Sequence, residues 1–183
     1  MCDSPLDSMR ASSFNRMTTA ILLAPYDEHW PAEFEAEAER IERACAGLPL
    51  RLEHVGSTAV PGLSAKPIID ILAGVPPKAR RRDYVVALAG IGYEHLGAHG
   101  IPGRDYFRRG VPRSHHVHLV SWSSAFWKEQ LLFRDWLRAH PERRREYEVL
   151  KRELALTFAG DHRGYNEAKG PFIRSVVREA SEP

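Results

Sequence analysis

The chain has 183 residues, of which 43% are hydrophobic and 27% are charged, and its formal net charge is +2. These values are typical of one globular domain with a sizeable core, and they exclude a chain that is disordered by composition. A net charge this small indicates neither a nucleic-acid nor a membrane partner. The two cysteines, Cys2 and Cys45, predict no disulfide framework, so we expect a reducing, cytoplasmic compartment.

Residues 1–16 are polar and aperiodic, and we expect a flexible N-terminal extension there, ahead of a single domain over residues 17–183. The extension lacks the apolar stretch of a signal peptide. No apolar run reaches the roughly 18 residues that span a bilayer. One sequence leaves the true start codon open between Met1 and Met17.

The first regular elements are a helix and a strand. Apolar residues recur at helical spacing from Phe34 to Cys45, with glutamates on the other face, which predicts a helix over residues 31–47. Residues 50–55 alternate between apolar and polar, which predicts a strand that leads into a Gly-Ser pair.

A second strand is predicted over residues 68–75, after a segment punctuated by proline and glycine. Its nearly continuous apolar character is typical of a central strand that is buried on both faces. The one ionisable residue within this run is Asp70.

The remaining chain alternates briefly between helix and strand and then becomes helical. The pattern predicts a helix over residues 77–90, a strand over 93–99, a loop or hairpin over 100–115 and a strand over 116–120. From Ser123 onward it is helical almost to the end, with breaks near residues 140–141 and 160–165. We therefore expect an α+β fold with three or four strands and a helical C-terminal third.

Gly56 and Ser57, at the end of the first strand, form the first candidate site. A glycine lets an anion approach the backbone, and the free N–H groups together with the serine hydroxyl make a nest for phosphate oxygens. Asp70 on the next strand supplies a carboxylate that can hold a divalent cation over those phosphates. The alternative is structural, with Asp70 satisfied by backbone donors. The segment does not have the spacing of a P-loop.

The segment HVGSTAVPGLSAKPIIDI, residues 54–71, resembles the signature of the GrpB family. The flanking matches are Tyr26-Asp27 with Trp30, Gly92-Tyr93, Gly103-Arg104 with Phe107, His116-x-His118, Phe133-Arg134-Asp135, Tyr147 with Lys151, and Tyr165 with Lys169. The resemblance implies a mixed β-sheet of the nucleotidyltransferase type, as in polymerase-β-like proteins, with flanking helices. Members are described as predicted nucleotidyltransferases, and a GrpB-like domain also occurs fused to dephospho-coenzyme A kinase.

The superfamily pattern is a Gly-Ser turn, a pair of aspartates one residue apart and a third acid on a later strand. The turn and Asp70 match this pattern, whereas Leu72 replaces the second aspartate and His116 and His118 stand where the third acid is expected. The resemblance thus implies Asp70 and His118 as catalytic residues. It also implies Asp70, His116 and His118 as ligands of a divalent metal (Mg, Mn or Zn), and imidazole favours Mn²⁺ or Zn²⁺.

Four basic residues and one histidine complete the candidate site. His54 stands beside the turn and can orient Ser57 or contact a phosphate, with a structural hydrogen bond as the alternative. Lys66 and Arg104 lie in family-matching segments and are the preferred groups for neutralising phosphate charge. The lesser candidates, equally explained as solvated surface bases, are Arg108 and Arg109.

Three functions are consistent with these residues. The first is a nucleotidyltransferase-like protein that binds a nucleotide or another phosphorylated small molecule, with metal-dependent nucleotidyl transfer. The second is a non-catalytic module that retains the fold and the phosphate nest, and the third is a metal-dependent phosphohydrolase. No basic strand interleaved with aromatic residues is present, so nucleic acid is not an expected partner. The nucleotide, the acceptor and the oligomeric state are left open.

Overall fold

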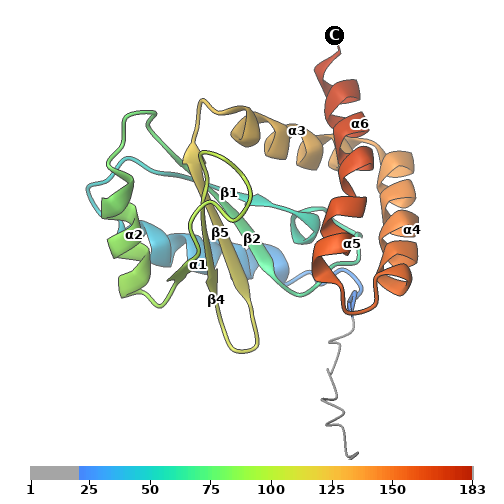
Figure 1. Ribbon diagram of the computed structural model, residues 1–183, viewed down its shortest axis with the longest axis horizontal. Helices are drawn as coiled ribbons and strands as arrows, with labels where there is room; N and C mark the ends of the chain where they lie inside the picture. Colours follow the sequence, from blue (N-terminus) through green and yellow to red (C-terminus); the bar gives the residue numbers. More distant parts are fainter. Residues whose placement is uncertain (1–20, 183) are drawn as a thin grey trace, which may run out of the picture.

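The protein is built around one mixed β-sheet, seen in a computed structural model that describes residues 21–182. The extension expected over residues 1–16 lies outside the described residues. Figure 1 shows the sheet, whose strands lie in the order β1-β2-β5-β4-β3. The strands are β1 (Arg51–Val55), β2 (Ile69–Val75), β3 (Glu94–His95), β4 (Asp105–Arg109) and β5 (His115–Ser121).

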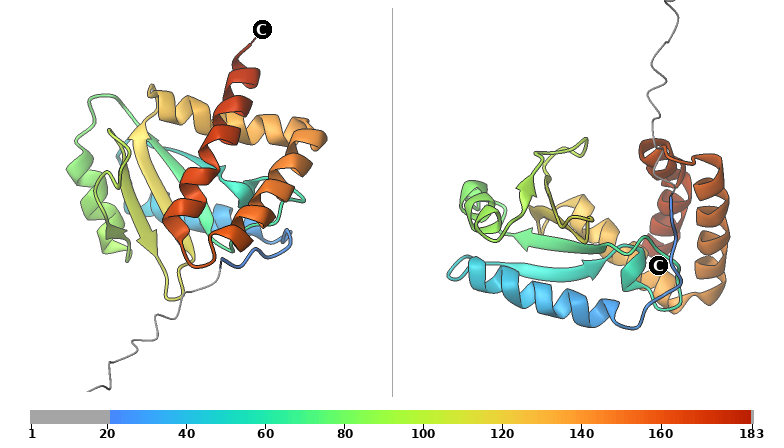
Figure 2. Two further views of the ribbon diagram at one scale, coloured as in Figure 1. Left: turned by 45° about the vertical axis from the view of Figure 1, so that its right-hand side comes forward. Right: turned by 90° about the horizontal axis from the view of Figure 1, so that it is seen from below.

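Helices lie on both faces of the sheet and at one end of it (Figures 1 and 2). They are α1 (Trp30–Ala44), the 3-10 helix η1 (Ser57–Ala59), α2 (Arg81–Gly90), α3 (Ala125–Ala139), α4 (Pro141–Thr157), α5 (His162–Ala168) and α6 (Gly170–Ser181). The central pair, β2 and β5, is parallel, and every other neighbouring pair is antiparallel.

Strand β2 sends its side chains alternately into two cores because side chains alternate across a strand. Ile69 and Ile71 pack in the core beneath α1 and α2, where Tyr84 and Leu88 of α2 are also buried. Leu72 faces the other way and packs on Trp127 of α3. A Cβ atom at Gly74 would meet the Trp127 ring at 2.5 Å, so the missing side chain lets α3 lie close to the sheet.

The C-terminal helices form a third packed unit with the segment that follows β1. Val60 and Leu63, from that segment, are buried with Leu137 of α3, Tyr147 of α4 and Val176 of α6. Figures 1 and 2 show α4, α5 and α6 standing together at one end of the sheet. The segment between β1 and β2 is therefore fixed by residues from the far end of the chain.

The α+β class, the mixed sheet and the helical C-terminal third are confirmed, and three details differ. Strand β4 lies inside residues 100–115 and pairs antiparallel with β5, which is the hairpin alternative for that segment, so the sheet has five strands instead of three or four. The strand predicted over 93–99 is reduced to Glu94–His95. Helix α2 begins at Arg81, after a Pro-Pro pair that delays it from the predicted residue 77.

Over the described residues 21–182, no helix combines the length and the apolar character needed to cross a membrane.

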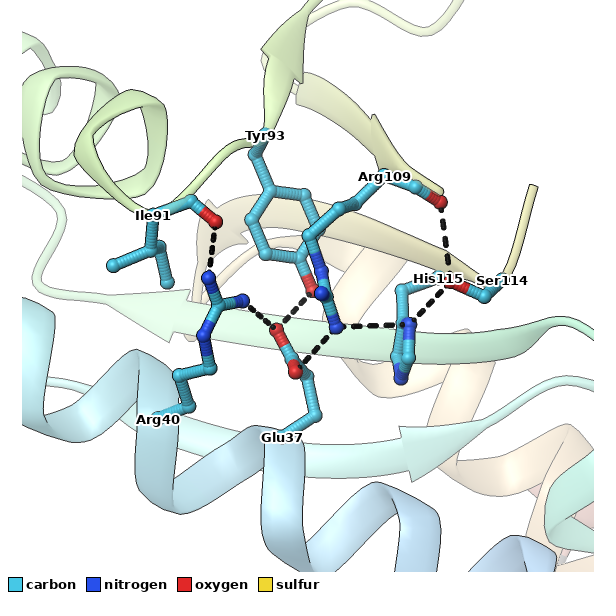
Figure 3. A network of polar contacts seen from close by, with 7 residues as sticks. All are labelled: Glu37, Arg40, Ile91, Tyr93, Arg109, Ser114 and His115. Carbon is cyan, nitrogen blue, oxygen red and sulfur yellow. Dashed lines mark hydrogen bonds and ion pairs between the residues drawn. The ribbon is translucent and has the colours of Figure 1, made fainter. Parts of the chain in front are cut away.

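A buried polar network links α1 to β4 and to the segment that follows α2, on one face of the sheet (Figure 3). Glu37 of α1 is only 5% exposed. Its carboxylate accepts hydrogen bonds from Arg109 of β4 at 2.5 Å, from the Tyr93 hydroxyl at 2.9 Å and from Arg40 at 3.1 Å. Arg40 also donates to the Ile91 carbonyl. The three hydrogen bonds offset the cost of burying the Glu37 carboxylate, and the same carboxylate satisfies the buried donor groups of its partners.

We expect Glu37→Ala to lower the free energy of unfolding by about 3 kcal/mol, because Arg109 and Tyr93 lose their shared acceptor inside the protein. Urea unfolding followed by circular dichroism measures the change. The matched control is Glu42→Ala, an exposed glutamate of the same helix, for which we expect about 0.5 kcal/mol or less. Equal losses in the two variants would mean that the network contributes little to stability.

Candidate functional site

The chain turns sharply at Gly56, between β1 and η1. Gly56 has φ 74° and ψ −171°, a conformation essentially restricted to glycine. Val55 pairs with Asp70 across β1 and β2, and a Cβ atom at Gly56 would lie 2.5 Å from Oδ2 of Asp70. The glycine therefore lets the Asp70 carboxylate lie directly against the turn.

Two histidines from the neighbouring parallel strand hold Asp70. The register pairs Asp70 with His116 and Leu72 with His118, so both imidazoles share the face of Asp70. Nδ1 of His116 lies 3.0 Å, and Nε2 of His118 3.5 Å, from Oδ1 of Asp70. Burial alone would raise the pKa of Asp70, but the hydrogen bonds from the two histidines hold the pKa far below its usual range. The carboxylate is therefore ionised.

Arg104 is a buried residue that supports His118. Its Nη1 donates to Nδ1 of His118 at 3.2 Å, and its other N–H groups donate to the carbonyls of Ala98 and His99. Because Nδ1 of His118 accepts, Nε2 carries the proton that is donated to Asp70. Burial lowers the pKa of His118, which favours this neutral tautomer. Arg104 thus acts on Asp70 through His118.

His54 lies on the opposite face of β1 from Asp70. Its ring stacks on Phe34 of α1 with centroids 4.9 Å apart, and its Nε2 lies 3.0 Å from the Thr58 hydroxyl. Burial lowers the pKa of His54 to about 4, so the ring is neutral. The structure shows the structural hydrogen bond that was the alternative for this residue.

The two lesser candidates are also engaged elsewhere. Arg108 pairs with Glu94 at 2.5 Å on the outer strands, and Arg109 belongs to the Glu37 network. Neither arginine lies beside the Gly56 turn.

Ser57 and Asp70 line a pocket between the end of the sheet and the C-terminal helices. Its volume is about 90 Å³. The polar residues that line it are Ser57, Thr58, Lys66, Asp70, Lys151, Tyr165 and Lys169. His116 and His118 do not line this pocket, but both contact Asp70, which does. Residues that are far apart in the sequence therefore share one site.

Two of the lysines are fixed by hydrogen bonds. Lys151 of α4 is 1% exposed, and its Nζ lies 3.5 Å from Oγ of Ser57 and donates to the Ser64 carbonyl. Burial lowers the pKa of Lys151 to about 8. Lys66 lies 2.8 Å from Nδ1 of His162, and burial also lowers the pKa of Lys66. Both ammonium groups are therefore held at the pocket wall.

The third lysine, Lys169, lies between α5 and α6 with its ammonium 4.3 Å from the centre of the Tyr165 ring. Among the described residues, this ammonium forms no ion pair. Burial, followed by the charge of Lys66, lowers the pKa of Lys169 to about 8. Three like charges around one small pocket repel one another, and an anion between them would relieve that repulsion.

The sequence identified Lys66 as a site residue but treated Lys151 and Lys169 only as matches to a family pattern. Both lie in a region predicted to be helical, and helical periodicity shows which face of a helix is buried but not which residues line a pocket. The available signal was their presence among the matched residues, each close to a matched tyrosine.

The side chains at Asp70 do not fit a metal centre. Within residues 21–182, no group of three or more His, Cys, Asp or Glu side chains is placed to hold a metal ion. His116 and His118 are both bonded to one oxygen of Asp70, and Leu72 is fully buried against Trp127. Since Mg²⁺ needs several oxygen ligands, a single carboxylate does not supply its shell.

Known proteins place this architecture in a family. A sequence model of the GrpB protein family matches residues 20–179. The chain belongs to the GrpB family. It is 42% identical to the UPF0157 protein PA4798 of Pseudomonas aeruginosa over 165 residues, covering 87% of this chain and 67% of that protein. The crystal structure of the conserved protein GrpB from Enterococcus faecalis matches with a TM-score of 0.78 at 35% identity, covering 87% of this chain and 96% of that one. The GrpB resemblance of residues 54–71 is confirmed.

A longer relative carries a GrpB-like part next to other sequence. The dephospho-CoA kinase of Mycolicibacterium paratuberculosis is 31% identical over 188 aligned residues, which cover 87% of this chain and 46% of that protein. This GrpB chain thus corresponds to about half of that kinase.

We expect Gly56→Ala to be more damaging than Gly62→Ala. Both glycines have positive φ, but an alanine at Gly56 would also meet Asp70, whereas the space beside Gly62 is open. The Gly56 variant should lose at least about 2 kcal/mol of unfolding free energy, and the Gly62 variant about 1 kcal/mol. Denaturant unfolding of the two proteins makes the comparison. A Gly56 variant as stable as the wild type would show that the turn and Asp70 can separate without cost.

Proposed function

We propose that this GrpB protein binds the phosphoryl group of a phosphorylated small molecule in the pocket beside the Gly56 turn. The observation that carries the proposal is the convergence of Lys66, Lys151 and Lys169 on one pocket that also contains the Ser57 hydroxyl. Ammonium and hydroxyl groups are donors for phosphate oxygens.

The three lysines would contribute differently to such a ligand. Lys151 and Lys66 already have protein partners, so they supply charge from fixed positions. Lys169 contacts the Tyr165 ring and is the ammonium with most freedom to turn toward an anion. A charge interaction in this partly buried pocket is stronger than the same interaction in water.

The size of the pocket limits what it can enclose. About 90 Å³ accommodates a phosphoryl group with a few water molecules, whereas pockets that enclose a drug-sized ligand have roughly 300–1,000 Å³. The rest of a nucleotide or another phosphorylated molecule would lie outside, over the surface. Dephospho-CoA and CoA belong among the ligands to be tried because a relative is named dephospho-CoA kinase.

Binding without turnover is the function that the geometry supports best. Metal-dependent nucleotidyl transfer and phosphate hydrolysis remain predictions, and a pocket with a single carboxylate favours neither. Incubation with nucleoside triphosphates and Mg²⁺ or Mn²⁺ separates the three. Release of pyrophosphate with a labelled acceptor would identify a transferase, release of phosphate alone a hydrolase, and saturable binding alone a binding module.

We expect Lys169→Gln to weaken phosphate binding at least tenfold, because a charged hydrogen bond contributes about 1.5–3 kcal/mol. Calorimetric titration with glycerol phosphate, ATP, CoA and dephospho-CoA gives the affinities. The matched control is Lys78→Gln, an exposed lysine away from the pocket, which should bind like the wild type. The melting temperature without ligand should stay level or rise in Lys169→Gln, because repulsion with Lys66 is removed. Unchanged affinity in this variant would contradict the proposed pocket.

We expect affinity for glycerol phosphate to fall as pH rises from 7.5 to 9.5. Lys151 and Lys169 have pKa values lowered to about 8, and their charged forms hold the anion, so deprotonation above that value removes the attraction. The other groups that face Lys169 do not reverse this trend. Burial also lowers the pKa of Lys66, so Lys66 too loses positive charge as the pH rises. Burial raises the pKa of Tyr165 to about 12, and Asp70 is ionised throughout, so neither changes its charge over this range.

Titrations at several pH values measure this dependence. The matched variant is Lys169→Arg, whose guanidinium stays charged over the whole range and should flatten the fall. A wild-type affinity that is constant over the range would argue that neither lysine contacts the ligand.

A further inference from the structure

Asp70 is the acidic residue that lines the pocket with the three lysines, while Glu148 lies behind Lys151, 3.6 Å from its ammonium. Asp70 lines the pocket together with Lys66, Lys151 and Lys169. The side-chain hydrogen bonds that Asp70 accepts come from His116 and His118 on its own face of the sheet. The carboxylate and the ammonium groups therefore stand around the pocket without neutralising one another by direct contact.

The two oxygens of Asp70 are not equivalent. Both histidines bond to Oδ1. Oδ2 lies against Gly56, in the turn that borders the pocket, and it accepts no hydrogen bond from the described residues. An ionised carboxylate can only accept hydrogen bonds, and the Asp70 side chain is 30% exposed, so Oδ2 is free to accept one from a ligand.

We propose that Asp70 makes the pocket selective for a phosphoryl ligand that presents an O–H donor to Oδ2, and that the pocket rejects an anion without such a donor. The donor is either a proton on the phosphoryl group itself or a hydroxyl next to it. This inference rests on the proposed function, since it specifies the ligand of the same pocket.

The selectivity follows from the chemistry of the two kinds of anion. Inorganic phosphate near neutral pH keeps at least one proton, whereas sulfate has the same shape and charge and no proton. Phosphate can therefore donate to Oδ2 while its other oxygens accept from the lysines. Sulfate would bring an oxygen lone pair against a carboxylate, which combines repulsion with an unpaired acceptor.

The surroundings of Asp70 fix this preference. The N–H groups of His116 and His118 both bond to Oδ1 of Asp70, which leaves Oδ2 as the acceptor beside the turn. Arg104 in turn sets the proton position on His118. Gly56 allows Oδ2 to stay at the edge of the turn. These contacts come from β2, β5 and the turn, and they leave the orientation of the carboxylate little freedom.

The test compares phosphate with sulfate by calorimetry at pH 7.5 in the presence of EDTA. Wild-type protein should bind phosphate at least tenfold more tightly than sulfate. In Asp70→Asn the amide can donate as well as accept, so sulfate binding should strengthen and the ratio should fall to about two or less. The matched control Asp83→Asn, on α2, should keep the wild-type ratio.

Two phosphate esters distinguish the sources of the donor. Glycerol 2-phosphate has hydroxyl groups beside the phosphoryl group, whereas methyl phosphate has none, and both are mainly dianions at pH 7.5. If only methyl phosphate binds as weakly as sulfate, a neighbouring hydroxyl satisfies Oδ2. If both esters bind weakly, the donor is the proton of inorganic phosphate. Either result supports the inference.

Other results overturn it in separable ways. Equal binding of phosphate and sulfate by the wild type would reject the selectivity and leave the phosphate pocket intact. Phosphate binding that needs Mg²⁺ or Mn²⁺ would mean that Asp70 faces a cation instead of a donor. If neither anion nor either ester binds, the proposed function fails, and the inference fails with it. The wild-type ratio is decisive even if Asp70→Asn does not fold.

Discussion

Lys151 is the group on which the assembly of the pocket depends. Its ammonium is almost fully buried, donates to the Ser64 carbonyl and lies 3.6 Å from Glu148 of the same helix. A buried ammonium without partners costs several kcal/mol, so α4 can pack in this position only when the segment after β1 presents its carbonyl. The same contact brings α4 beside Ser57. Docking of the C-terminal helices and completion of the pocket are therefore one event.

The sheet contributes the other half of the site through a single register. Because β2 and β5 run parallel, Asp70 lies beside His116, and the next residue on the same face is His118. A carboxylate at the end of a buried strand is then satisfied by imidazole N–H groups. This arrangement explains how the chain keeps a nucleotidyltransferase-like fold while Leu72 fills a core position where the superfamily has an acid.

The sequence predicted the parts of this structure that depend on local pattern. Periodicity located α1, β1 and β2. Asp70 was identified because it is the single acidic residue in an apolar strand, and the Gly-Ser pair was identified because it follows a predicted strand. Strand β4 was predicted only through the hairpin alternative for residues 100–115, because its five residues are mostly polar or charged and do not alternate as a strand pattern. Lys151 and Lys169 were missed as site residues because only tertiary packing brings them to a turn that lies about one hundred residues earlier in the chain. The sequence placed His54 beside the Gly56 turn, and the structure shows that its side chain lies on the face of the sheet opposite to Asp70. That difference depends on the register between β1 and β2.

The order in which the residues of the pocket occur along the chain has a consequence for its synthesis. The turn and Asp70 are translated early, whereas Lys151 and Lys169 come about eighty to one hundred residues later, in α4 and between α5 and α6. N-terminal parts of a protein generally begin to fold first during translation. A nascent chain would thus form the sheet, with Lys66, Asp70 and its histidines, before Lys151 and Lys169 were in place. The pocket could hold an anion only after α4, α5 and α6 had packed beside the turn.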